Sequence, residues 1–511
     1  MKNWLALFGA MLGAFMAVLD IQITNASLND ISGALGCSID EGSWISTSYL
    51  VAEIVVIGTS AWMARVLSLK RYLLFSTVAF VGFSVLCAFS QNLNMMILAR
   101  ACQGLTGGSL IPLAMLVNLN LLPPSKRPVG NAIFAMTATF APAVGPTIGG
   151  WLTDNYGWQW IFFINIVPGV IMFLLITANL EPSEPQPELL KDGDYWGILS
   201  MGLGLGSLEY VLEEGERKDW FGNPLIVRFA VVAVVFIALF LIIELRSKKP
   251  FVDLRVFRHR NLTLCSLILG ALGLALYGSV YLIPLYLAQV QGYSPLQIGL
   301  TLMWVGLPQL FILPFVPKLM RIMDPRLVAG IGILLFALSC FMNSFLDLDF
   351  AMDQFRLSNI VRALGQPLLF VPLLSMSTEG IPREQVGSAS ALFNMTRNIG
   401  GSVGIALLST VVTQRDHLHS VHIGESVTTY SPAVQERLDT LTTMFTTKGI
   451  DPATASSYAL TALNRSVQKQ SLLFAYGDAF LVIGVVLLLS GIGLFFLPKP
   501  HASAGGVPSA H

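Results

Sequence analysis

Six charged residues interrupt long apolar stretches of the sequence, and their types are those that could move protons. They are Asp20, Glu53, Arg100, Glu209, Arg362 and Arg397. Charged side chains are costly inside a membrane, so those found there usually serve a function. A carboxylate in a low-dielectric site resists ionisation, whereas a nearby cation favours it, and the balance of the two allows proton binding and release near physiological pH. A proton-coupled carrier needs this property.

Asp20 and Arg100 are the first candidates, and we expect them to form an ion pair. Protonating Asp20 would weaken this pair, and a cationic or polar substrate could compete for the same groups. A purely structural ion pair is the alternative. Glu53 is the second candidate for a proton or substrate site, although it could line a solvated crevice without a role. Glu209 is a weaker candidate because it lies close to the predicted outer surface.

The composition places these residues in an integral membrane protein. The 511 residues are 54% hydrophobic and 12% charged, with a mean hydropathy of +0.68, well outside the range of soluble globular chains. Thirty basic and thirty acidic residues cancel, so no net charge points to nucleic acid as a partner. The elements that position the charged residues are therefore expected to be transmembrane helices, in an all-α polytopic fold.

Several other chemistries find no support in the sequence. The five cysteines are scattered without metal-site spacing, and no phosphate-binding loop, nucleophile elbow or HExxH motif is present. Three histidines near Asp416 (His417, His419 and His422) are interpreted as solvated loop residues rather than metal ligands. We expect no enzyme activity, no cofactor and no metal.

Runs of about 20 apolar residues predict fourteen membrane spans. The first run is long enough to be a retained helix rather than a signal peptide. The predicted spans are residues 5–28, 44–64, 72–91, 94–120, 129–153, 159–179, 194–213, 225–245, 262–289, 296–317, 327–346, 354–377, 386–412 and 472–497.

The distribution of lysine and arginine predicts the orientation, because positive loops face the cytoplasm. If the N-terminus is cytoplasmic, the basic residues fall in inner loops, and both termini are cytoplasmic. These residues include Arg65, Lys70, Arg71, Lys126, Arg127, Arg246, Lys248, Lys249, Arg255, Arg258, Arg260, Lys318, Arg321 and Arg326.

Two polar stretches divide the chain. A Pro- and Glu-rich segment at 181–194 is typical of a linker, which gives a six-helix bundle over 1–180, a linker with two inserted helices over 181–250, and a second six-helix bundle over 251–500. Residues 501–511 form a cytoplasmic tail. The polar segment 414–470 is predicted to lie outside, as short amphipathic helices that are either a docking surface or a tolerated insertion.

A weak internal repeat supports the two bundles. Leu98–Gly104 reads LARACQG and Ile360–Pro367 reads IVRALGQP, and each is followed by a Leu- and Pro-containing run. Duplicated halves around a central site are a common plan for transporters.

The span at 129–153 ends in the sequence APAVGPTIGG, from Ala141 to Gly150. Two prolines and three glycines predict a helix that bends and packs closely, because neighbouring helices in lipid satisfy the freed backbone groups.

Several motifs together resemble the fourteen-helix drug/proton antiporters of the major facilitator superfamily, in particular the EmrB-type pumps. Gly145, Pro146, Gly149 and Gly150 match the antiporter motif GxxxGPxxGG. The segment from Leu19 to Ala26, which contains Asn25, resembles the LDxTIVNVALP signature but departs from it at Gln22 and Ala26. Arg100 and Gln103 match the RxxQG motif, and the segment from Asp154 to Asn165 is similar to the sequence leading into the sixth helix.

One family motif is altered. The GxLADRxGRK loop aligns with Ala61–Lys70, which lacks the acidic residue and both glycines, so a cytoplasmic gating loop there would rely on Arg65, Lys70 and Arg71.

The resemblance implies a major facilitator fold with two extra central helices and export of hydrophobic compounds across the inner membrane against protons. It also implies a periplasmic adaptor, or membrane fusion protein, and an outer-membrane channel as partners. An exporter of one endogenous metabolite, of fatty acid or siderophore type, and a non-transporting membrane scaffold are the alternatives.

Overall fold

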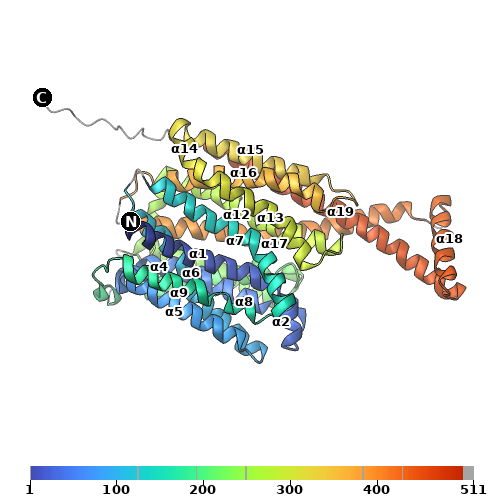
Figure 1. The fold of residues 1–511 in the computed structure, drawn as a ribbon, viewed down its shortest axis with the longest axis horizontal. Helices are drawn as coiled ribbons and strands as arrows, with labels where there is room; N and C mark the ends of the chain where they lie inside the picture. The colour runs from blue at the N-terminus through green and yellow to red at the C-terminus, as the bar shows by residue number, and fades with distance from the viewer. Residues whose placement is uncertain are drawn as a thin grey trace.

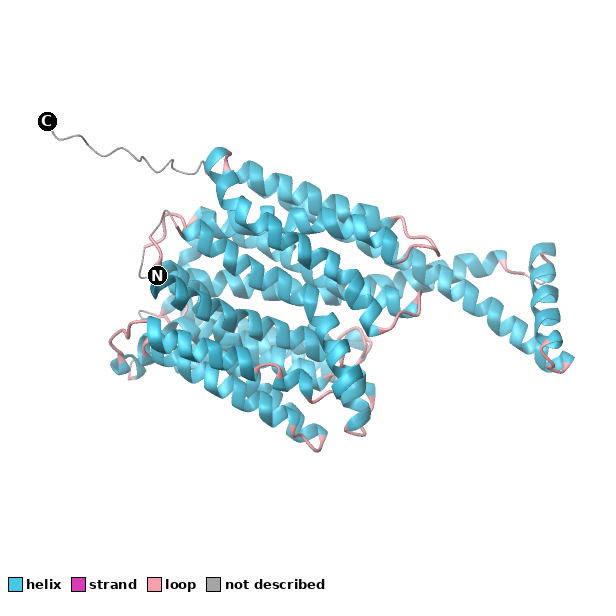
Figure 2. Ribbon diagram, viewed as in Figure 1, coloured by secondary structure: helices cyan, strands magenta, loops and turns pink. Residues whose placement is uncertain are grey.

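The computed structural model describes residues 2–123, 126–191, 193–247, 250–382, 385–428 and 430–498. The predicted tail 501–511 and the loop residues Lys248 and Lys249 lie outside this part of the chain. Every regular element within it is helical, with no strand (Figure 2). The all-α prediction is therefore confirmed.

The N-terminal helices are α1 (Lys2–Ala26), α2 (Leu28–Ala34), α3 (Ile39–Gly42), α4 (Trp44–Leu67), α5 (Leu69–Ala88), α6 (Leu93–Leu121), α7 (Arg127–Tyr156), α8 (Trp160–Phe163) and α9 (Ile166–Asn179). The linker holds the short 3₁₀ helix η1 (Pro187–Leu190) and leads into α10 (Tyr195–Glu214), η2 (Trp220–Gly222), α11 (Pro224–Arg246) and η3 (Leu254–Arg258). The remaining elements are α12 (Arg260–Gln289), α13 (Pro295–Ile312), η4 (Leu313–Phe315), α14 (Val316–Ile322), α15 (Pro325–Ser344), α16 (Met352–Ser377), α17 (Val386–Ser426), α18 (Pro432–Thr447) and α19 (Pro452–Phe495).

Local sequence signals mark several helix starts. The Asn92 side chain accepts a hydrogen bond from the Met95 backbone N–H at 2.9 Å, and Asp194 accepts one from Gly197 at 2.8 Å. Ser294 and Gln297 form a capping box at the start of α13. Such caps satisfy backbone N–H groups that the first helical turn leaves without partners.

Eleven helices in the described ranges are long and apolar enough to cross a membrane, and bent α7 makes a twelfth. The predicted bend in α7 is present, because Arg127–Pro142 and Val144–Tyr156 meet at 44°. Two predicted spans fall on helices outside this set: α10, which carries three glutamates, and α17, which has a long polar extension. The count of fourteen remains a prediction.

The helices pack in a pattern that repeats between the two ends of the chain. Helix α1 packs on α6, α7 and α9, and α12 packs in the same way on α16, α17 and α19. The two sets meet where α7 contacts α13 and where α17 contacts α4. Helix α10 packs on both α4 and α17, so the inserted pair α10 and α11 lies beside this junction.

The polar segment 414–470 forms an arm, which Figure 1 shows projecting from the end of the bundle opposite Lys2. The polar sequence predicts short amphipathic helices here. Instead, α17 and α19 continue beyond the apolar core as 41- and 44-residue helices, and only α18 is separate. Hydropathy marks where a helix leaves an apolar environment, which need not be where the helix ends.

Candidate functional site

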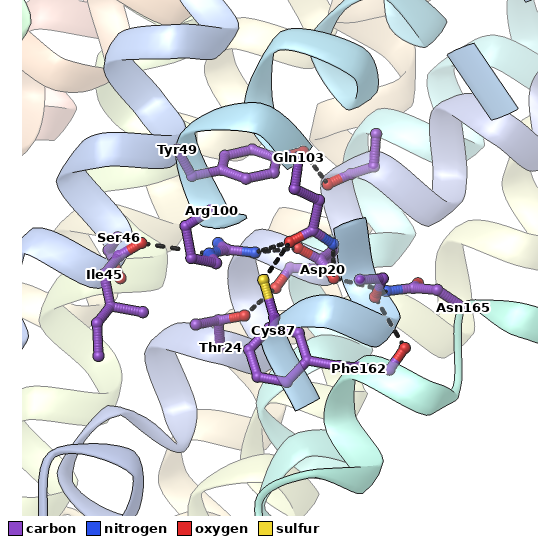
Figure 3. A network of polar contacts seen from close by, with 12 residues as sticks. Asp20, Thr24, Ile45, Ser46, Tyr49, Cys87, Arg100, Gln103, Phe162 and Asn165 are labelled. Atoms are coloured by element: carbon purple, nitrogen blue, oxygen red, sulfur yellow. Dashed lines mark hydrogen bonds and ion pairs between the residues drawn. The ribbon is translucent and has the colours of Figure 1, made fainter. Parts of the chain in front are cut away.

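Asp20 and Arg100 form the predicted ion pair. Arg100 Nη1 lies 2.5 Å from Asp20 Oδ2, and both side chains are 1% exposed. Asp20 comes from α1 and Arg100 from α6, which pack against each other. Figure 3 shows the pair inside a polar network that the surrounding helices enclose.

Two side-chain amides complete the surroundings of Asp20. Its Oδ1 atom accepts a hydrogen bond from Gln103 Nε2 at 3.0 Å and one from Asn165 Nδ2 at 2.6 Å. Gln103 Oε1 in turn accepts from Arg100 Nη1 at 2.8 Å. Asp20 is therefore held by three neighbouring side chains, one cation and two amides.

Arg100 also holds α4 in place. Its Nε–H donates to the Ile45 carbonyl oxygen at 3.2 Å, and its guanidinium carbon lies 4.3 Å from the centre of the Tyr49 ring. Removing one partner of a buried ion pair typically costs about 3–5 kcal/mol. A change in the charge of this pair would therefore alter contacts of α1, α4 and α6.

Asn165 is a residue of this site that the sequence does not predict. It lies between α8 and α9, and besides Asp20 it donates to Ser84 Oγ at 2.9 Å. It belongs to the Asp154–Asn165 segment that carries the family resemblance, which was the available signal. Tyr49 was also missed, because its sequence neighbours give no sign of its contact with Arg100.

A second polar centre surrounds a cavity of about 70 Å³. Glu53 from α4 and Glu209 from α10 both line it, together with Tyr277 from α12 and Asn398 and Ser402 from α17. The cavity therefore lies at the junction between the N-terminal helices, the inserted pair and the C-terminal helices.

The two glutamates have different partners. Glu53 is 3% exposed and interacts with the Asn398 side chain and with the charges of Arg397 and Arg100. Glu209 Oε1 accepts a hydrogen bond from Ser402 Oγ at 2.7 Å. Its side chain is 3% exposed, and α10 packs on α4 and α17. The position of Glu209 near the outer membrane face stays a prediction.

Asp20 itself does not line this cavity. The next residues of α1 do so: Ile21, Gln22 and Asn25. Asn25 is exposed and accepts a hydrogen bond from Ser46 Oγ at 2.5 Å. The Asp20–Arg100 pair and the cavity are therefore separate in this structure, and direct competition of a substrate for the pair stays a prediction.

The other two predicted arginines are apart from the Asp20 pair. Arg397 is 2% exposed, and its Nε and Nη2 atoms donate to Asn398 Oδ1 at 3.4 and 3.3 Å. Arg362 on α16 is also 2% exposed and donates through Nη2 to the Leu276 carbonyl oxygen at 3.3 Å.

The antiporter-motif glycines bring α7 against α1. A Cβ atom on Gly145 would lie 2.4 Å from Gln22 Cβ, and one on Gly149 would lie 2.9 Å from the Ile23 carbonyl oxygen. Real Cβ atoms do not approach this closely, so these positions require glycine. Pro146 is half-buried, and Gly150 is buried beside them.

Of the candidate gating-loop residues, Lys70 makes a hydrogen bond to the end of α9 and Arg65 makes one to the linker. Lys70 Nζ donates to the Thr177 carbonyl oxygen at 2.7 Å, at the end of α9, and the Arg65 carbonyl oxygen accepts from the Gln186 N–H of the linker at 3.1 Å. Arg71 is exposed. Ser68 between α4 and α5 has a φ of 76°, a conformation that normally favours glycine.

The three histidines lie on α17 and not in a loop, which corrects the interpretation from sequence. His419 Nε2 lies 2.9 Å from Asp478 Oδ2, and Arg415 Nε lies 3.0 Å from the same oxygen. Asp416 accepts a hydrogen bond from Ser471. These contacts join α17 to α19 at the base of the arm.

Known proteins resemble this chain in sequence. The family model described as Major Facilitator Superfamily matches residues 10–405. The chain belongs to the major facilitator superfamily. Within the superfamily it is similar to the colistin resistance protein EmrB of Acinetobacter baumannii, with 34% identity over 98% of this chain and 97% of that protein. It is also similar to the multidrug export protein EmrB of Escherichia coli K12, with 32% identity over 98% of this chain and 96% of that protein.

A solved superfamily structure shares the fold. The human organic anion transporter MFSD10 aligns with a TM-score of 0.57 and 12% identity, over 95% of this chain and 99% of that chain. The predicted resemblance to EmrB-type pumps is confirmed, and the chain is a multi-pass membrane transporter of this superfamily. No enzyme activity is indicated by these relatives.

Proposed function

We propose that this protein is a proton-coupled antiporter that exports hydrophobic drugs and toxic compounds across the inner membrane by alternating access. The observation that carries the proposal is the buried Asp20–Arg100 pair. Asp20 belongs to α1 and Arg100 contacts α4, and both of these helices also line the cavity that holds Glu53 and Glu209. A titratable pair and a polar cavity on common helices are the parts that a coupled exchanger needs.

Coupling follows from unequal stability of two states. A proton on Asp20 would weaken its attraction to Arg100 and release the hold on α1, α4 and α6. A substrate in the cavity contacts the same α1 and α4 through Gln22, Asn25 and Glu53. A ligand shifts a two-state equilibrium only by its difference in affinity for the two states, so proton and substrate should favour opposite openings.

The moving bodies in this proposal are the bundles 1–180 and 251–500, with the segment 181–250 as an inserted pair. The repeated packing of α1 and α12, and the crossed contacts of α7 with α13 and of α17 with α4, support a rocking motion about this junction. We include α10 and α17 as spans, which gives fourteen crossings. An even number places both termini on one side, the cytoplasmic side by the distribution of basic residues.

We also propose that the protein works as the pump of a tripartite system. The arm 414–470 is the contact for a periplasmic adaptor, which connects the pump to an outer-membrane channel. The arm supports this proposal because it is mostly polar and exposed, and projects beyond the helix bundle (Figure 1).

Proteoliposomes that contain this chain alone would test the proposal. We expect hydrophobic compounds on the cytoplasmic face of the protein to be exchanged against protons when a pH gradient is imposed. Transport of several unrelated compounds would favour a multidrug exporter, and transport of one compound would indicate a dedicated exporter. Absence of any substrate-induced proton flux would indicate a scaffold and contradict the proposal.

A further inference from the structure

Arg362 is a buried cation that lacks a counter-ion. Its side chain is 2% exposed, and it takes part in no ion pair within the described residues. Only Nη2 donates a hydrogen bond, at 3.3 Å, whereas buried Nε and Nη1 have no partner among the described residues. Arginine stays charged in proteins, and an unpaired buried charge is strongly unfavourable.

The equivalent position in the N-terminal repeat has the missing partner. Arg100 on α6 faces Asp20 of α1, whereas Arg362 on α16 donates to the Leu276 carbonyl oxygen of α12. The packing of α1 on α6 corresponds to that of α12 on α16. The C-terminal repeat therefore keeps the guanidinium, but the sequence of α12 contains no carboxylate to face it.

Arg362 borders a small cavity at the junction of the two bundles. Arg362 and Gln366 line it from α16, Leu302 and Val305 from α13, and Pro142 from α7. Its volume is about 10 Å³, roughly enough for one water molecule. Pro142 closes the cavity on the side of the N-terminal bundle, so a larger occupant requires α7 to move away from α13 and α16.

A neighbour of the lining residue Gln366 has a further buried polar atom without a partner among the described residues. Gln309 donates a hydrogen bond to Gln366 Oε1, but its own Oε1 atom accepts none from the described residues. The site thus combines a fixed positive charge, polar amides and apolar walls from α12 and α13. This combination suits an ionised head group attached to an apolar body.

We infer that Arg362 is an anion-binding site that takes the carboxylate of an amphipathic organic acid. The carboxylate supplies the counter-ion that α12 lacks, and the apolar walls contact the rest of the molecule. Because Pro142 must withdraw to admit it, the acid binds preferentially to the state in which α7 has separated from α13 and α16, and it stabilises that state. The binding site itself does not depend on the proposed transport function. Only the assignment of the bound state to a step of the transport cycle rests on that function.

Equilibrium binding to the purified full chain in nanodiscs tests the inference. Radiolabelled decanoate and decanamide have the same chain and differ in charge. We expect the affinity of the wild type for decanoate to exceed its affinity for decanamide by about tenfold or more. The reason is that hydrogen bonds to a charged group are stronger than those to a neutral group. Arg362→Gln should remove this preference and leave decanamide binding unchanged, and Arg362→Lys should keep part of it.

Arg356→Gln is the matched control, because Arg356 is an exposed arginine on the same helix and should leave the preference intact. A wild type without preference, or an Arg362→Gln variant that keeps it, would overturn the inference. Tighter binding of labelled chloride than of decanoate, with both lost in Arg362→Gln, would assign the site to a free inorganic anion and overturn the assignment to an organic acid.

The same experiment separates this inference from the proposed function. Decanoate binding that depends on Arg362, without transport in proteoliposomes, supports the site and contradicts the exporter. Proton-coupled transport of neutral compounds by a chain whose decanoate binding ignores Arg362 supports the exporter and overturns the site.

Discussion

Tyr49 and Glu53 lie one helical turn apart on α4 and connect the two polar centres. The Tyr49 ring lies 4.3 Å from the Arg100 guanidinium carbon, and Glu53 lines the central cavity. Residues four positions apart share a helix face, so a shift of α4 at Tyr49 displaces Glu53 as well. This relationship gives the Asp20–Arg100 pair and the cavity a common mechanical element.

The close contact between α7 and α1 predicts the effect of enlarging Gly149. A methyl group there would lie 3.1 Å from Ile23 Cα and 2.9 Å from the Ile23 carbonyl oxygen. We expect Gly149→Ala to destabilise the protein by about 1–3 kcal/mol and to reduce efflux. Thermal unfolding in detergent measures the first effect and a whole-cell efflux assay the second.

Gly82→Ala is the control for this change. Gly82 lies on α5, and a Cβ atom added to it would meet no neighbouring atom within 4 Å among the described residues. Its substitution should therefore leave both measurements at the wild-type value. Equal stability of Gly149→Ala and Gly82→Ala would show that the α1–α7 contact is not as tight as described.

The position of Glu209 predicts a role in charge selectivity. Glu209→Gln keeps an oxygen that can accept the hydrogen bond from Ser402 but removes the acidic group that a cationic substrate would meet in the cavity. We expect the KM for cationic amphiphiles such as tetraphenylphosphonium to rise about five- to tenfold, the equivalent of about 1 kcal/mol, with little change for neutral compounds. Transport kinetics in proteoliposomes measure the difference. Glu188→Gln in the exposed linker is the control, and an identical KM in both variants would remove Glu209 from the substrate site.

The arm predicts a separable binding function. Replacing residues 427–451, which include α18, with a short Gly/Ser connection removes exposed residues without touching the buried network. We expect the adaptor to be lost from pull-downs, whereas proton-coupled transport in proteoliposomes persists. Retention of adaptor binding by the shortened arm would place the contact elsewhere.

The turn between α18 and α19 predicts a pH dependence outside the membrane. The Thr454 side chain and its backbone N–H bind the Asp451 carboxylate and lower its pKa below the ordinary 3.8. Because the folded pKa is the lower one, the stabilisation is complete above the unfolded value and is lost as the pH falls through the folded value. The protection of the Thr454 amide against hydrogen exchange should therefore fall below about pH 4.

The start of α18 is the internal reference for this measurement, since Ser431 makes no side-chain cap there. A protection factor for Thr454 that changes with pH only as much as those at the start of α18 would show that Asp451 does not act as a cap.

Much of the fold was predictable because hydropathy and helix-breaking residues act locally. The bend of α7 follows from its prolines, and the Asp20–Arg100 pair follows from the cost of isolated charges in apolar helices. Asn165 was missed because its contact with Asp20 spans 145 positions of the chain. Such a contact depends on the rotation of packed helices, which a single sequence does not specify.

One error concerns the arm. The polar segment 414–470 is predicted to form short helices, whereas α17 and α19 extend into it as long helices. Apolar runs indicate the membrane-embedded part of a helix and say little about its full length.

Substrate-induced proton flux in proteoliposomes that carry Asp20→Asn tests the central claim most directly. Asparagine keeps an oxygen for Gln103 and Asn165 but removes the charge opposite Arg100, so folding should be checked by thermal unfolding. Asp30→Asn, at an exposed position on α2, is the control. We predict that Asp20→Asn reduces the flux to that of empty liposomes while Asp30→Asn retains it, and a wild-type flux through folded Asp20→Asn would contradict the account.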